Sequence, residues 1–125
     1  MINKLDFLLI EPSLDWEKDR YIKIGMRVEK DIPIRESPRI AAGYMLSVLK
    51  KHGYKAQFIS MAHEGVSVEG LLNHIKDKKP SLIGMTAFTF QIPIVGKMAN
   101  IIKAQFPEIP ICVGGCHVTS LPLQT

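Results

Sequence analysis

The chain has 125 residues, of which 46% are hydrophobic and 22% charged, and its formal net charge is +4 at pH 7. This length suits one domain with one core, the composition is that of an ordinary globular protein, and two cysteines exclude a disulfide framework. The basic residues are scattered, no apolar run is long enough for a membrane span, and nothing at the N-terminus looks like a signal peptide. We therefore expect a cytoplasmic protein that binds neither nucleic acid nor membrane.

The first predicted element is a strand over residues 5–10 (LDFLLI), a nearly continuous apolar run. Such runs are typical of parallel sheets that are covered on both faces. Pro12 ends this strand, because proline cannot continue a central strand. Residues 13–37 follow as a long, charged stretch without a clear period, which we expect to be a loop insertion. It is either a solvated excursion or a flap over a ligand, and the sequence leaves both interpretations open.

Residues 39–52 are expected to form a helix, with Ala41, Met45 and Val48 or Leu49 recurring at helical spacing. Gly53 follows as a left-handed residue that ends the helix. Residues 55–60 (KAQFIS) predict a second strand, and its shorter, more polar sequence places it at an edge of the sheet.

A second helix is predicted to begin after Ser67, whose side chain can cap it. Its apolar face consists of Val68, Leu71, Leu72 and Ile75, and His74 lies at the boundary of that face. Pro80 ends the helix.

Two further buried strands are predicted at Leu82–Met85 and Ile111–Val113, with a helix between them. The apolar residues at helical spacing in this helix are Val95, Met98, Ala99, Ile102 and Phe106. Strands and helices therefore alternate along the chain, which implies right-handed crossovers. We expect an α/β fold with a flavodoxin-like (Rossmann-like), doubly wound parallel sheet of strand order 2-1-3-4.

Three loops follow the first, third and fourth strands, with the sequences EPS, TAFT and GGCHVT. In this strand order they border one crevice, where ligands of such sheets bind. Two adjacent glycines let a ligand lie against the backbone, threonines offer hydroxyls, and the next helix starts offer free N–H groups. These features suit a flat or bulky ligand with phosphate or amide groups. The candidate binding residues are Glu11, Pro12, Ser13, Thr86, Ala87, Phe88, Thr89, Gly114, Gly115, His117, Val118 and Thr119.

Other functional motifs are missing from the sequence. There is no G-x-G-x-x-G after the first strand, no P-loop, and no acidic set of a phospho-acceptor domain. Cys112 and Cys116 have no third cysteine with which to hold a metal cluster, and we expect Cys112 to be a small core residue. No catalytic motif is found, so whether the chain belongs to an enzyme stays open.

Four segments together resemble a known family: FLLIEP, SPRIAAGYMLSVLKKHGY, SLIGMTAFTF and PEIPICVGGCHVTSLP. They are similar to the cobalamin (vitamin B12)-binding-like N-terminal domain of radical-SAM enzymes, such as cobalamin-dependent methyltransferases and the anaerobic magnesium-protoporphyrin monomethyl ester cyclase. The last segment matches a fairly specific pattern, P-x-[IV]-P-[IV]-[IV]-x-G-G-x-H-x-[ST]-x-x-P, in which Cys116 stands where proline is usual. The match extends over nearly the whole chain.

The resemblance implies that the loop at 86–88 approaches the nucleotide tail of cobalamin and that Gly114 and Gly115 let this tail lie close. It also implies that His117 and Thr119 line the site. The motif D-x-H-x-x-G, which supplies a histidine ligand to cobalt in other cobalamin carriers, does not occur in the sequence. Cobalamin is therefore expected to bind base-off, without a protein histidine from that motif.

The radical-SAM motif C-x-x-x-C-x-x-C is also missing. S-adenosylmethionine and a 4Fe–4S cluster are accordingly expected only in a radical-SAM domain outside this chain, which would be its partner. We expect the chain to be C-terminally truncated near the start of a helix at 121–125, without a fifth strand, and to self-associate through the exposed strand edge. Two alternatives stay open: the same domain without a cofactor in a structural or substrate-facing role, and a flavin or nucleotide binder.

Overall fold

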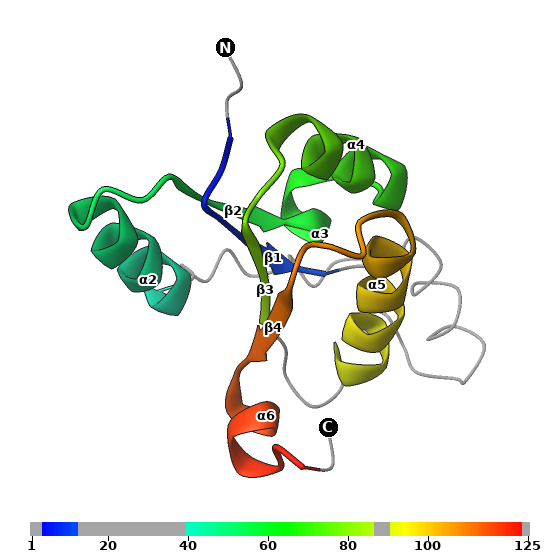
Figure 1. Ribbon diagram of the computed structural model, residues 1–125. Coiled ribbons are helices and arrows are strands. Elements are labelled where there is room, and N and C mark those ends of the chain that lie inside the picture. The colour runs from blue at the N-terminus through cyan, green and yellow to red at the C-terminus, as the bar shows by residue number, and fades with distance from the viewer. Residues whose placement is uncertain (1–3, 13–39, 87–90, 124–125) are drawn as a thin grey trace.

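The computed structural model describes residues 4–12, 40–86 and 91–123 (Figure 1). Four parallel strands form one sheet in the order β2-β1-β3-β4. The strands are β1 (Phe7–Glu11), β2 (Ala56–Ser60), β3 (Leu82–Thr86) and β4 (Ile111–Gly114). The helices are α2 (Ile40–Lys51), α3 (Met61–Glu64), α4 (Val68–Lys78), α5 (Ile92–Gln105) and α6 (Cys116–Ser120). The predicted flavodoxin-like α/β fold and strand order are confirmed, while the predicted loop at 13–37 lies outside the described residues.

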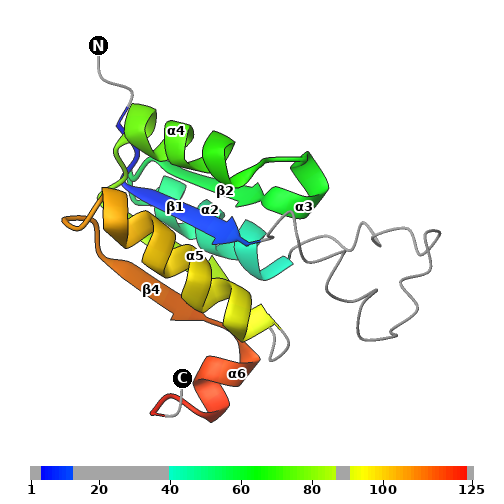
Figure 2. The same ribbon diagram turned by 90° about the vertical axis from the view of Figure 1, so that its right-hand side faces the viewer.

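Helices cover the sheet on both faces, but unequally. Figure 2 shows α4 and α5 in front of the sheet and α2 behind it. Successive side chains of a strand point to opposite faces. Leu8 and Ile10 of β1 accordingly join the large core on the α4–α5 face, whereas Phe7 and Leu9 join a small cluster with Ala42 of α2. We call the second side of the sheet the α2 face.

The helices α4 and α5 are built as the sequence predicts. The Ser67 hydroxyl accepts a hydrogen bond from the Gly70 N–H at 3.0 Å and so caps α4. Leu71 and Ile75 of α4 are fully buried. In α5, the buried residues are Ile94, Val95, Met98 and Ile102. His74 lies at the boundary of the core, where its Nε2 is 2.8 Å from Oε1 of Gln57. Within the described segments, no helix is both long and apolar enough to cross a membrane.

The inward face of α2 differs from the predicted one. Ala41, Met45 and Val48, which the spacing selects, are all exposed. Ala42 and Leu49 belong to the small cluster on the sheet, and Leu46 is half-buried. The prediction was therefore wrong at Ala41 and Met45, whereas Leu49, which it gave as the alternative to Val48, is confirmed. α2 has a second apolar stripe at helical spacing, and periodicity cannot decide between two stripes. Gly53, which follows α2, has the predicted positive φ of 84°.

The prediction that Cys112 is a small core residue was wrong, because its side chain is exposed. Its strand, β4, lies at the edge of the sheet. Ile111 and Val113 pack against the core on the α4–α5 face, so Cys112 points to the α2 face. Among the described helices only α2 covers that face, and its contacts are with β1, β2 and Leu82 of β3. The apolar strand sequence is therefore buried on one face only.

Gly84 lies where the ring of Phe7 crosses β3, and this close approach yields a testable prediction. A Cβ at position 84 would lie 2.6 Å from Cζ of Phe7, in a buried site. We expect Gly84→Ala to lower the free energy of unfolding by about 1–3 kcal/mol, because Phe7 must shift. Urea denaturation measures this change.

Gly43 is the matched control, since a Cβ there would meet nothing within 4 Å. It lies in the middle of α2, where glycine is a poor helix former. Gly43→Ala should therefore raise the free energy of unfolding by about 0.5–1 kcal/mol. Equal destabilisation of both variants would show that the Phe7 contact is not what requires glycine at position 84.

Candidate functional site

Four residues lie side by side at the carboxyl ends of the strands. Glu11 of β1 pairs with Ser60 of β2, and Thr86 of β3 pairs with Gly114 of β4. Because Ile10 pairs with Met85, Glu11 and Thr86 are neighbours in the next row. The pleat directs all four positions to the α2 face, like Phe7 and Leu9. The register thus brings the carboxyl ends of β1, β3 and β4, from which the predicted loops continue, to one edge.

Glu11 and Ser60 form a buried polar pair in this row. Glu11 is 9% exposed and Ser60 is 5% exposed. The Ser60 hydroxyl donates to Oε1 of Glu11 over a long distance of 3.4 Å. The Ser60 backbone N–H donates to Oε2 of Glu64 at 2.7 Å. The pair places a carboxylate near the middle of the edge, where it can accept hydrogen bonds.

Sequence reasoning found Glu11 but missed Ser60, Glu64 and the whole of α3. One local signal was available, because a serine followed closely by a glutamate is typical of a helix start at which the glutamate accepts from the serine N–H. The Glu11–Ser60 contact had no such signal. It joins residues 49 positions apart and depends on the pairing of β1 with β2.

After β4 the chain forms a helix, and not the loop that the sequence predicts at 114–119. Gly115 has a φ of 122°, which favours glycine, and the chain turns there directly from β4 into α6. The helix thus begins at Cys116 and not near residue 121. The Thr119 N–H donates to the Gly115 carbonyl at 3.1 Å, as expected in a first helical turn. Figure 1 shows α6 beyond the end of β4.

The other predicted residues lie as follows. Pro12 is buried directly after β1, and Thr86 is half-buried at the end of β3. His117, Val118 and Thr119 all lie in α6, where Val118 is half-buried and Thr119 exposed. Ser13, Ala87, Phe88 and Thr89 lie outside the described residues. The structure therefore brings the ends of β1, β3 and β4 together, and α6 extends from the same edge.

This edge offers bare backbone beside polar groups. Gly114 is exposed, and a Cβ built on it meets no atom of the described residues within 4 Å. A ligand can therefore lie directly on the end of β4, as the two glycines predict. Thr86 supplies a hydroxyl beside this surface and Glu11 an acceptor. Among the described residues, no group of three histidine, cysteine or acidic side chains could hold a metal ion. The arrangement suits an organic ligand with hydrogen-bonding groups.

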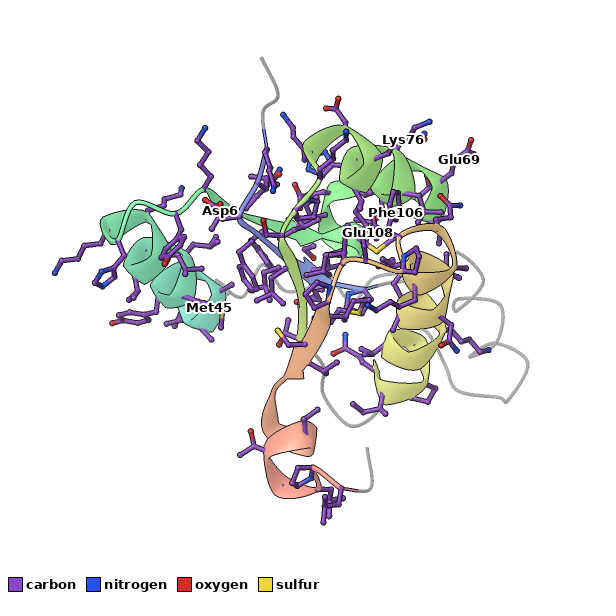
Figure 3. All side chains as sticks on the ribbon, in the orientation of Figure 1. Asp6, Met45, Glu69, Lys76, Phe106 and Glu108 are labelled. Carbon is purple, nitrogen blue, oxygen red and sulfur yellow. The ribbon has the colours of Figure 1, made fainter. Side chains whose placement is uncertain are left out.

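A pocket of about 690 Å³ lies at the opposite edge, near the amino ends of β3 and β4. Lys4, Lys76, Lys79, Phe106 and Glu108 are among its lining residues, of which Figure 3 labels Lys76, Phe106 and Glu108. The helices α4 and α5 both end at this edge, and lysines are common at helix C-termini because they offset the helix dipole. The C-terminal end of α4 thus explains Lys76 and Lys79 without a ligand. Ligands of open α/β sheets bind at the carboxyl edge.

Comparison with known proteins adds one finding. The family model described as the B12 binding domain matches residues 35–125 of the chain. The match includes α2 and every later element. Neither the curated proteins nor the solved structures contain a significant match.

Proposed function

This chain belongs to the B12 binding domain family, and we propose on that basis that it holds cobalamin at the carboxyl edge of its sheet. The observation that supports this location is the open space above Gly114, beside Gly115 with its positive φ. Backbone without side chains at a strand end accepts a bulky ligand at short range. Thr86 and Glu11 lie in the same row and can bond to its polar groups.

The proposed binding mode is base-off. The sequence has no D-x-H-x-x-G motif that would supply cobalt with a histidine. In this mode the nucleotide tail of cobalamin lies against Gly114 and Gly115, and α6 with His117, Val118 and Thr119 borders it. The residues Pro12, Ser13, Ala87, Phe88 and Thr89 complete the proposed site. Bound cobalamin supplies methyl transfer or radical chemistry, while the chain binds and orients it.

The proposed partner is a radical-SAM domain outside this chain, as in methyltransferases or cyclases of that class. Such a domain would carry the 4Fe–4S cluster and bind S-adenosylmethionine. The support is the resemblance of four segments of the sequence to domains of such enzymes.

Retention of cobalamin tests the proposed function. The purified chain is mixed with hydroxocobalamin, passed through a desalting column and examined by visible absorption. We expect cobalamin to co-elute with the protein and to show the spectrum of the base-off form. A His117→Ala variant should give the same spectrum, because no protein histidine is proposed to bind cobalt. Complete loss of the cofactor on the column would refute the proposal.

We also propose that the chain self-associates through β4. The Ile83 N–H bonds to the Pro110 carbonyl at 3.0 Å, so residues 110, 112 and 114 face β3. Ile111 and Val113 therefore direct their N–H and C=O groups away from the sheet, which favours pairing with another strand. We expect the average mass to rise with concentration above the 14.0 kDa of the monomer in sedimentation equilibrium.

The exposed Cys112 allows a matched test of this edge. Cys112→Lys places a charge on the edge strand and should restore the monomer, because charged side chains oppose edge pairing. Cys112→Ser should associate like the wild type, which excludes a disulfide through Cys112 as the cause. A wild-type chain that stays monomeric at every concentration would contradict the proposal.

A further inference from the structure

The pocket of about 690 Å³ near the amino ends of β3 and β4, which we call the amino-edge pocket, has a largely apolar lining. Its apolar residues include Ile75, Pro80 and Ile109, which are all buried. Phe106, the residue that ends α5, is half-buried and adds an aromatic ring. Small-molecule sites are mostly apolar and have volumes of about 300–1,000 Å³. The amino-edge pocket can therefore hold the apolar body of a ligand.

Charged side chains from three segments line the same pocket. Lys4 lies before β1, and Lys76 and Lys79 lie at the end of α4. The single acidic residue of the lining, Glu108, follows α5. Figure 3 shows Lys76 on α4, and Phe106 and Glu108 at the end of α5. Within the described part of the chain, no hydrogen bond or ion pair engages these four charged groups, so their charges are available to a ligand.

The two helix ends account for only part of this positive charge. Both α4 and α5 end at this edge, and the C-terminus of a helix acts as about half a negative charge. The two ends together therefore offset about one lysine, and Glu108 offsets a second. At the end of α5, Lys103 already bonds the carbonyls of Pro107 and Ile109 through its Nζ. About one positive charge thus remains in the pocket, and Lys4 is the lysine that belongs to no helix.

We propose that the amino-edge pocket binds an aromatic carboxylate, with its ring against Phe106 and its carboxylate beside Lys4. A carboxylate accepts hydrogen bonds from ammonium groups, and such charge-assisted bonds are stronger than neutral ones. A ring suits this lining because aromatic pairs attract in offset or edge-to-face arrangements. The pocket lies at the opposite edge of the sheet from the proposed cobalamin surface. The inference is thus a second site, and it does not depend on the proposed function.

Fluorescence titration of the full chain tests this site with two probes of nearly equal size, naphthoate and its neutral amide, naphthamide. We expect the wild type to bind naphthoate roughly fivefold or more tightly, because one unit charge at about 4 Å gives this factor even in water. Lys4→Gln removes the surplus charge, so its preference should fall to about twofold or less. Lys4→Arg keeps the charge and should restore the preference. Phe106→Leu lacks the ring and should weaken both probes by a similar factor.

Lys51→Gln is the matched control, because Lys51 is an exposed lysine at the end of α2, which covers the other face of the sheet. It lowers the net charge as much as Lys4→Gln does and should bind both probes like the wild type. Thermal unfolding by circular dichroism verifies that each variant is folded. The proposal is overturned if the wild type binds both probes equally or does not bind naphthoate at millimolar concentration. It is also overturned if Lys51→Gln loses the preference as Lys4→Gln does, or if Phe106→Leu binds like the wild type.

Discussion

Gly114→Val is expected to abolish most cobalamin binding while the fold is retained. Among the described residues, no atom lies within 4 Å of a Cβ built on Gly114. Valine is a favourable residue in a strand, and the free energy of unfolding should change by less than about 0.5 kcal/mol. The same side chain occupies the proposed ligand surface. Forcing a ligand past added methyl groups costs about 1–3 kcal/mol, so we expect affinity to fall about tenfold to hundredfold.

Gly115→Val separates this effect from damage to the backbone. Its φ of 122° strains any residue with a Cβ, at a cost of about 1–3 kcal/mol. This variant should therefore lose stability and affinity together, whereas Gly114→Val loses affinity alone. Absorbance titration with hydroxocobalamin and urea denaturation measure the two quantities. Unchanged affinity in Gly114→Val would mean that the ligand does not lie on the end of β4.

Ile83→Ala is expected to cause the largest loss of stability. Ile83 is fully buried in β3, between β1 and β4, and belongs to the core under α4 and α5. Replacing a buried isoleucine with alanine costs about 2–5 kcal/mol through lost burial and the cavity left behind. Since domains of this size are stable by only about 5–15 kcal/mol, the variant should unfold at much lower urea concentration.

Ile40 supplies the matched control, because the same residue type is 64% exposed at the start of α2. Ile40→Ala should change the free energy of unfolding by less than about 0.5 kcal/mol. Equilibrium denaturation followed by circular dichroism gives both values. A loss below about 1 kcal/mol in Ile83→Ala would contradict the assignment of this core.

Local patterns were sufficient to predict burial wherever the apolar pattern of an element has a single interpretation. In α4, a capping serine and the spacing of Leu71 and Ile75 identify the helix, its start and its buried side. In β1, a continuous apolar run predicts a strand that is covered on both faces, and both cores do meet there. These elements were predictable because the spacing of their apolar residues shows which faces are buried.

The same patterns failed where burial depends on what lies opposite. In α2, two apolar stripes were available, and contact with Phe7 and Leu9 selects Ala42 over Ala41. Cys112 has an apolar strand sequence, yet its side chain points to the α2 face at the edge strand β4, which the described part of α2 does not reach. Neither outcome can be read from spacing, since it depends on the partner of each surface.

The sequence by itself therefore determined the α/β class, the strand order and the edge at which the loops after β1, β3 and β4 meet. Alternating strands and helices with right-handed crossovers permit few other arrangements. Only the tertiary structure decided which stripe of α2 is buried, that Gly115 turns β4 directly into α6, and that Ser60 contacts Glu11. These features depend on the register of strands far apart in the chain, where a shift of one residue would direct each side chain to the opposite face.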